Sequence, residues 1–261
     1  LMKNLGNITI LILGIILVSS FSERDRDKME NSKTTKVVMA YYVPEREYRP
    51  ENLPLHQLTH IIFSFTNVID GEMKFRDAQN GEKLRKLAEQ RENHPQLKVM
   101  IACGGWGADG FSDMAHTKEN REIFIQSVLE FNREYQLDGI DIDWEYPGIP
   151  AAKTKARPED KENFTLLMKE LREGLNTLER EQTLTFASAG WKRYYNNVEI
   201  KEVMKYVDYM NVMTYDQIGA TTPYTGHHTA LGLIEFEDIK DTPAAKYVEQ
   251  RRAEKIGRAH V

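Results

Sequence analysis

From residue 36 onward, the hydrophobic and polar positions define two kinds of segment that alternate along the chain. Short runs rich in β-branched and aromatic residues are typical of buried strands, and the longer segments between them are polar and prone to helix. The pattern predicts strands at 36–43, 58–68, 97–105, 137–145, 183–191 and 207–216. It predicts helices at 81–93, 117–135, 158–181, 197–206 and 242–255, and Thr117 is a candidate N-cap.

Strands that alternate with helices predict parallel pairing. An open sheet that binds a dinucleotide carries a glycine-rich turn after its first strand, whereas here the first strand leads into "YYVPERE", which has no glycine. We therefore predict an α/β protein with a (β/α)8 TIM barrel. Only about six β/α units are visible, so the barrel is expected to be truncated.

The amino-terminal residues predict export. Residues 1–22 contain one lysine, an apolar run and then small residues, which is typical of a signal peptide. The run is short for a membrane span, which needs about 20 apolar residues, and an uncleaved anchor is the alternative. A polar linker is predicted at 23–35. We expect a secreted, extracellular or periplasmic protein with no stable membrane association after cleavage.

The composition limits the partners further. The 261 residues are 41% hydrophobic and 29% charged, with a formal net charge of −5, as in ordinary soluble domains. Such weak acidity gives no reason to expect a nucleic-acid partner. The single cysteine, Cys103, lies in an apolar run and is expected to be a small buried residue. We expect a monomer without a cofactor.

The predicted strand at 137–145 carries an unusual row of acids within "LDGIDIDWEYPG". Because successive side chains of a strand point to opposite faces, one face holds Ile140, Ile142 and Trp144, and the other holds Asp141, Asp143 and Glu145. Acids inside a barrel cost several kcal/mol each unless they are paired. An exposed acidic edge would suit an antiparallel sheet better, and a cation site would lack histidine or further acids to complete it. The row favours acid catalysis.

Three segments resemble motifs of glycoside hydrolase family 18, the chitinases and their relatives. The sequence "DGIDIDWEYP" is similar to the DGxDxDxE motif, "ACGGW" at 102–106 to SxGGW, and "MNVMTYD" at 210–216 to the sixth-strand motif. Ala102 replaces the usual serine, which places the fine positioning of the first acid in doubt. "AYY" and "THIIFSF" also match, so the resemblance covers residues 36 to about 230 and implies a partial catalytic barrel at 36–255.

The resemblance implies roles for five residues. Glu145 would be the general acid, kept protonated by burial and by the neighbouring Asp143 anion. Asp141 would share a proton with Asp143. The N-acetyl oxygen of the substrate would act as the nucleophile, and this family is an exception to the rule that a second carboxylate does so. Asp143 would stabilise the charge that develops on the acetamido group, while Tyr215 and Asp216 would orient that group.

Other residues match family positions that touch sugars. The substrate-binding candidates are Tyr41, Phe65, Trp106, Tyr146 and Met213. The alternative for each aromatic residue is core packing, which face parity favours for Phe63. The residues His60, His227 and His228 have no partners at metal-ligand spacing, and we interpret them as structural or loop residues.

The resulting hypothesis is a secreted chitinase that hydrolyses β-1,4-N-acetylglucosamine linkages with retention. The alternatives are an endo-β-N-acetylglucosaminidase acting on N-glycans and a chitinase-like lectin that binds without cutting. "WEYPG" favours chitin, and Glu145 argues against the lectin. The ending "KIGRAHV" resembles an in-frame sequencing adapter, so 256–261 are expected to be non-native and the fragment itself to hydrolyse little.

Overall fold

A computed structural model describes residues 36–44, 49–216, 218 and 227–229 of the chain. The predicted signal peptide, the linker at 23–35, the helix at 242–255 and the tail at 256–261 lie outside the described residues. The sheet and its helices belong to one compact unit that begins at Val38. No helix in the described ranges has the length and apolar character needed to cross a membrane.

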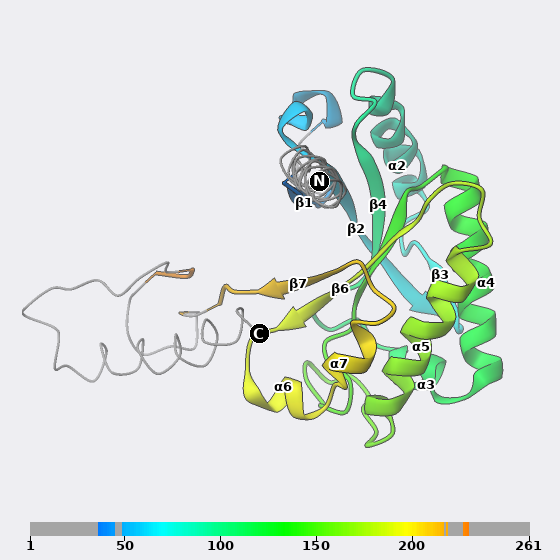
Figure 1. The fold of residues 1–261 in the computed structure, drawn as a ribbon, viewed down its shortest axis with the longest axis vertical. Helices are drawn as coiled ribbons and strands as arrows, with labels where there is room; N and C mark the ends of the chain where they lie inside the picture. The colour runs from blue at the N-terminus through cyan, green and yellow to red at the C-terminus, as the bar shows by residue number, and fades with distance from the viewer. Residues whose placement is uncertain (1–35, 45–48, 217, 219–226, 230–261) are drawn as a thin grey trace, which may run out of the picture. The chain divides into compact units, whose positions relative to one another are not determined.

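Parallel strands form a curved sheet whose order follows the chain (Figure 1). They are β1 (Met39–Tyr42), β2 (His60–Ile69), β4 (Lys98–Gly104), β5 (Gly139–Asp143), β6 (Thr183–Ala189) and β7 (Tyr209–Met213). Each lies within a predicted strand, except that β2 continues one residue further. Consecutive strands that pair in parallel, with helices between them, are the architecture of a (β/α)8 barrel, and the described strands form six-eighths of one. The predicted fold class is confirmed.

The helices cover the outer face of this sheet (Figure 1). They are α2 (Gln79–Glu89), α3 (Phe111–His116), α4 (Lys118–Tyr135), α5 (Asp160–Leu175), α6 (Lys192–Asn196) and α7 (Ile200–Val203), with short 3₁₀ turns at Pro50–Asn52, Leu55–Gln57 and Gln90–Glu92. The predicted cap of α4 is confirmed, because the Thr117 hydroxyl accepts from the Asn120 backbone N–H at 3.2 Å.

Two helical predictions were too long. The helix predicted at 158–181 ends at Leu175, because the next backbone N–H groups, of Thr177 and Leu178, donate three residues back to Gly174 and Leu175 at 2.9 and 3.1 Å, in 3₁₀ turns that close the helix. The helix predicted at 197–206 is reduced to α7, and α6 precedes it.

A hairpin was missed. Strand β3 (Glu72–Lys74) pairs antiparallel with the end of β2 across Asp70-Gly71, both of which have positive φ. The Asp-Gly pair is a signal for such a turn.

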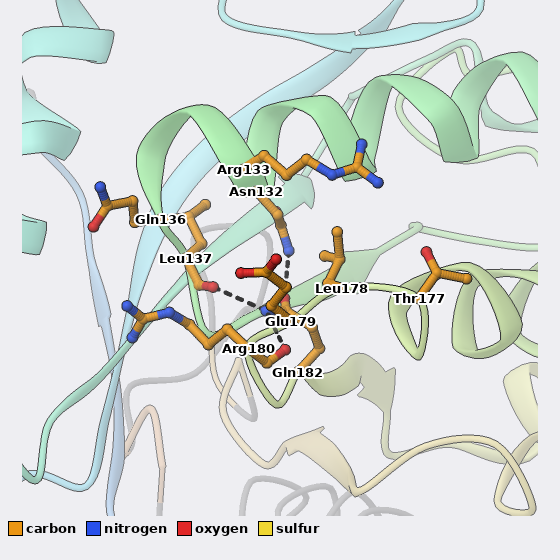
Figure 2. Close-up of a pocket in the computed structure, with 9 residues that line it drawn as sticks. All are labelled: Asn132, Arg133, Gln136, Leu137, Thr177, Leu178, Glu179, Arg180 and Gln182. Atoms are coloured by element: carbon orange, nitrogen blue, oxygen red, sulfur yellow. Dashed lines mark hydrogen bonds between the residues drawn. The ribbon is translucent and has the colours of Figure 1, made fainter.

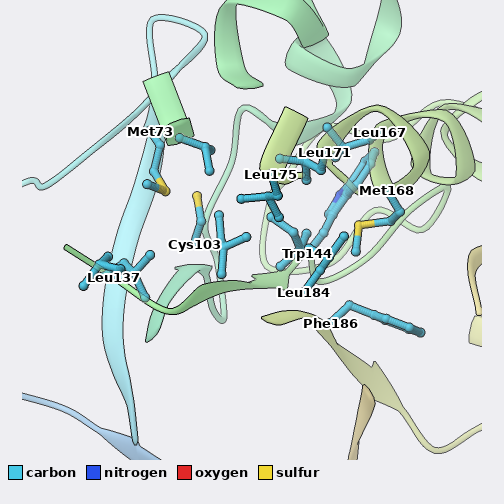
Figure 3. Packing of buried hydrophobic residues seen from close by; sticks show 14 of the residues in the cluster. Met73, Cys103, Leu137, Trp144, Leu167, Met168, Leu171, Leu175, Leu184 and Phe186 are labelled. Carbon is cyan, nitrogen blue, oxygen red and sulfur yellow. The ribbon is translucent and has the colours of Figure 1, made fainter. Parts of the chain in front are cut away.

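The face parity predicted for β5 is confirmed. Ile140, Ile142 and Trp144 belong to the large apolar cluster between the sheet and the helices, where Figure 3 shows Trp144 beside Leu167 and Leu171 of α5. Phe63 and Cys103 belong to the same cluster, as predicted. Burial raises the pKa of the Cys103 thiol to about 12, so it remains protonated. A much smaller apolar cluster on the inner face consists of Ile62, Met100 and Ala102, with Met39 and Phe65 packed against it.

Trp144 fixes the end of β5 to the helical layer. Its ring stacks on Phe111 of α3 at 5.5 Å and meets the edge of Phe164 of α5 at 6.0 Å, and the residue is only 3% exposed. Trp144→Ala is expected to lower the free energy of unfolding by about 3–5 kcal/mol, since it leaves a cavity between two helices. Urea unfolding measures this loss.

The control for this substitution is Trp106→Ala, which removes a ring of the same size that is 69% exposed. Its expected effect on the free energy of unfolding is less than about 0.5 kcal/mol. Equal losses in the two variants would contradict the anchoring role of Trp144.

Candidate active site

Strand β5 directs the three predicted acids into the barrel interior. Asp141 is fully buried, Asp143 is 5% exposed and Glu145, just beyond the strand, is 8% exposed. They rise in order toward the carboxyl ends of the strands, where barrel enzymes place their reactive groups. In the part of the chain that the structure describes, no three or more His, Cys, Asp or Glu side chains are arranged to hold a metal ion.

Asp141 is held by donors from three other strands. The Tyr41 hydroxyl donates to Oδ2 at 3.0 Å, the Thr185 hydroxyl to Oδ1 at 2.5 Å, and Asn211 Nδ2 to Oδ1 at 3.1 Å. Burial raises the pKa of Asp141, and these hydrogen bonds oppose that rise because they favour the carboxylate. Sequence reasoning missed Thr185 and Asn211, although Asn211 lies within the "MNVMTYD" motif.

Ala102 pairs in register with Asp141, so its methyl group stands where a serine hydroxyl was expected. The first acid nevertheless has a full set of donors. Tyr41 is one of these donors, and it does not line the cavity of about 550 Å³ that opens above the acids. The structure therefore places the Tyr41 hydroxyl on the acid, and its sugar contact stays a prediction.

Asp143 differs from Asp141 in its surroundings. Its Oδ1 atom is buried and has no hydrogen-bond partner among the described residues. Burial raises the pKa of Asp143 well above its ordinary value, and the charges of Glu145 and Asp141 raise it further. Three donors therefore stabilise the carboxylate of Asp141, whereas Asp143 Oδ1 has no donor among the described residues that would stabilise its charge.

Glu145 has the electrostatic character of a general acid. Burial is the main cause of its raised pKa, and the charge of Asp216 adds to it, whereas a hydrogen bond from Tyr146 acts in the opposite direction. The repulsion between Glu145 and Asp143 that the sequence predicts acts mainly on Asp143, whose pKa it raises.

A cavity of about 550 Å³ opens above these acids. It brings together eight of the ten predicted site residues with Gly105, Ala189 and Trp191, and the eight are Phe65, Trp106, Asp143, Glu145, Tyr146, Met213, Tyr215 and Asp216. The Tyr146 ring lies edge-on between Trp106 at 6.4 Å and Trp191 at 5.0 Å. Trp191 was not predicted, although it ends the fifth predicted strand as Trp106 follows the third.

The two glycines of "ACGGW" let β4 approach the acids closely. Gly104 has φ 127°, and a Cβ there would lie 2.0 Å from the Asp143 carbonyl oxygen. The next residue, Gly105, donates its backbone N–H to that same oxygen at 2.9 Å. Any side chain at position 104 would push Asp143 out of place.

Tyr215 and Asp216 both contact His228, for which the sequence predicts a structural or loop role. His228 Nε2 lies 2.6 Å from Asp216 Oδ1, and its ring stacks on Tyr215 with centroids 6.0 Å apart. Burial, with the charges of Asp143 and Glu145, raises the pKa of Tyr215 to about 12, so its hydroxyl remains a donor. His60, by contrast, is buried beside Thr59, as expected of a structural residue.

A second pocket, of about 520 Å³, lies at the amino-terminal ends of β5 and β6 (Figure 2). Gln182 Nε2 donates there to the Leu137 and Arg180 carbonyls at 3.0 and 3.1 Å, and Asn132 Nδ2 donates to Gln182 Oε1 at 2.7 Å. These polar groups join the end of α4 to β6. None of the predicted site residues lines this pocket.

A parallel β/α barrel with acids rising to its carboxyl-terminal mouth defines the class of this protein. Residues 37–256 match the model of glycosyl hydrolases family 18, and the chain belongs to that family. It is 39% identical over 176 residues to chitinase A1 of Niallia circulans, covering 64% of this chain and 24% of the relative. It is 31% identical over 215 residues to probable chitinase 2 of Drosophila melanogaster, covering 75% of this chain and 43% of the relative.

Solved structures that resemble this chain include members of the same family. A family 18 N-acetylglucosaminidase from Paenibacillus barengoltzii has a TM-score of 0.69 and 36% identity, and the match covers 76% of this chain and 59% of that one. Chitinase ChiA74 from Bacillus thuringiensis has a TM-score of 0.74 and 25% identity, and the match covers 85% of this chain and 46% of that one. The chain spans less than half the length of the two curated relatives.

Proposed function

We propose that the protein is a chitinase that hydrolyses β-1,4 linkages between N-acetylglucosamine units with retention of configuration. One observation carries this proposal: Glu145, a buried carboxyl with a raised pKa, opens into a cavity walled by Trp106, Tyr146 and Trp191. A carboxyl that keeps its proton beside apolar rings is suited to protonate a glycosidic oxygen.

In the first step, Glu145 gives its proton to the glycosidic oxygen as the bond from that oxygen to the anomeric carbon breaks. The carbonyl oxygen of the substrate's N-acetyl group forms the new bond to the anomeric carbon from the opposite face, and an oxazolinium ion results. In the second step, the Glu145 carboxylate takes a proton from water as the water oxygen opens this ring. Two displacements at one carbon restore the original configuration.

The neighbouring residues support this use of the acetamido group. Asp143 lines the cavity next to Glu145, so its carboxyl is placed to accept from the acetamido N–H. Tyr215 and Asp216 line the same cavity and present a neutral hydroxyl and a carboxylate. A donor to the acetamido oxygen and an acceptor for its N–H hold the group in position for attack.

The substrate class follows from the cavity walls. Trp106 is 69% exposed, and an exposed ring of this size at a cavity rim is suited to the apolar face of a sugar. Chitin and chitooligosaccharides repeat such faces along a chain. The N-glycan core contains the same β-1,4 linkage between two N-acetylglucosamine units, so it is the second candidate substrate. We also propose that the protein acts outside the cell, where polymeric chitin is found.

The test uses the gene product at its full encoded length, incubated with N-acetylglucosamine tetramers and pentamers and, separately, with an N-glycan. We expect cleavage of the oligomers, and proton NMR of the first products should show the β-anomer. An initial α-anomer would contradict retention. Cleavage of the N-glycan alone would indicate an endo-β-N-acetylglucosaminidase, and binding without turnover would indicate a lectin.

A further inference from the structure

Asp160 is a fully buried acid outside the cavity that the proposed mechanism does not use. It is the first residue of α5, and it follows the long loop that begins at Glu145. Its side chain is surrounded by that loop and by α3. A buried carboxyl is costly unless its oxygens are bonded, so the contacts of Asp160 indicate what it does.

The Asp160 carboxyl accepts three hydrogen bonds from two separate elements. The Ser112 hydroxyl of α3 donates to Oδ1 at 2.8 Å. The backbone N–H groups of Arg157 and Gly148 donate to Oδ2 at 2.7 and 3.2 Å. Asp160 therefore connects both ends of the loop to a helix in the outer layer.

The bond to Gly148 is the one closest to the predicted general acid. Glu145 is followed by a turn in which the Ile149 N–H donates to the Tyr146 carbonyl at 3.2 Å, and Gly148 lies within that turn. Gly148 has φ 65°, and a Cβ there would lie 2.8 Å from Asn197 Oδ1. The turn is therefore closely packed on one side and bonded to Asp160 on the other.

The same two helices hold the residue before Glu145. Trp144 packs between Phe111 of α3 and Phe164 of α5, and these flank the partners of the polar contact, Ser112 and Asp160. Glu145 thus lies between two attachments to one pair of helices. The apolar attachment sets the position of the strand end, and the polar one sets the direction of the turn.

We propose that Asp160 is a positioning residue that aims the Glu145 carboxyl at the glycosidic oxygen through its bonds to Gly148 and Ser112. The proposal rests on the proposed function. Without Asp160, the N–H groups of Gly148 and Arg157 lose their buried acceptor, and the turn after Glu145 reorganises to satisfy them. A shift of about 1 Å in a reacting group can cost on the order of 100-fold in rate.

The test compares two substrates of the full-length gene product. In a chitooligosaccharide the leaving group is a hydroxyl of the next sugar, and its departure needs the proton of Glu145. In a 2,4-dinitrophenyl glycoside of the same sugar the leaving group is the stable dinitrophenolate anion, which departs without that proton. For Asp160→Ala we expect kcat/KM, which reports only the step in which the leaving group departs, to fall by about 10–100-fold on the oligosaccharide and by less than about 3-fold on the aryl glycoside. Equal losses on both substrates would overturn the proposal, since damage to the fold lowers both alike.

Two further variants sharpen the comparison. Asp160→Asn keeps an oxygen that can accept from Gly148 while its amide N–H donates to the Ser112 hydroxyl, so it should restore most of the oligosaccharide rate. Glu122→Gln is the control, because Glu122 is an exposed acid of α4 that pairs with Lys118 and bonds neither Ser112 nor Asp160. It should leave the ratio of the two rates unchanged.

The remaining outcomes are also decisive. If Asp160→Ala does not fold, Ser112→Ala replaces it, and this variant must lower the oligosaccharide rate relative to the aryl rate; an unchanged ratio overturns the proposal. If the unaltered protein hydrolyses neither substrate, the proposed function itself fails, and the inference fails with it. Activity of the unaltered protein on both substrates separates these two cases.

Discussion

Glu145→Gln is expected to lower kcat on chitooligosaccharides by about 10²–10⁴-fold, the usual contribution of a positioned general acid. Glutamine has the shape of glutamic acid but has no acidic proton to give to the leaving oxygen. Because the protonated form of Glu145 is already favoured by burial, the neutral amide should fit the site without loss of stability. The oligosaccharide should therefore still bind.

The measurement is kcat and Kd for the same oligomer, with thermal unfolding to verify the fold. Glu122→Gln is the matched control, since Glu122 is an exposed residue of α4 that pairs with Lys118 on the outer surface. The control should keep full activity. A Glu145→Gln protein with more than about one tenth of the original kcat would rule out the general-acid role.

Asp143→Asn is expected to reduce kcat by about 10²–10³-fold and at the same time to stabilise the fold at neutral pH. The loss of activity arises because an amide cannot supply the negative charge that the developing oxazolinium ion requires. The gain in stability arises because burial and two neighbouring acids oppose ionisation of Asp143. Removing a group of this kind typically gains about 0.5–2 kcal/mol.

The pH dependence of this gain has a definite sign. The folded-state pKa of Asp143 lies well above its ordinary value of 3.8, so its contribution to stability is fully present below that value and is lost as pH rises through the folded-state pKa. The asparagine side chain of the variant is neutral throughout this range. The variant should therefore match the unaltered protein near pH 4 and exceed it at pH 7, as measured by urea unfolding.

Asp113→Asn is the control, because its effect on stability at neutral pH should have the opposite sign. Lys155 and Arg157 lower the pKa of Asp113, so its contribution is present above its ordinary value and is lost in acid. This variant should be slightly less stable than the unaltered protein at pH 7. A gain at neutral pH in both variants would mean that the effect at Asp143 does not come from its burial.

The sequence by itself determined the elements and the direction of the acids. The alternation within "GIDIDWE" placed Asp141, Asp143 and Glu145 on one face because a strand repeats every two residues. The same local rules identified the Thr117 cap and the buried Cys103. They failed where the signal was short, as at α6 and β3, or where 3₁₀ turns ended α5 early.

Only the tertiary structure decided which groups meet at those acids. Asp141 receives donors 100, 44 and 70 residues away in the chain, from β1, β6 and β7. Parallel strands bring distant residues to one edge of the sheet, and periodicity carries no information about which of them face each other. For the same reason Asp216, which follows β7, lies on the same cavity as Glu145, which follows β5, and its charge raises the pKa of Glu145.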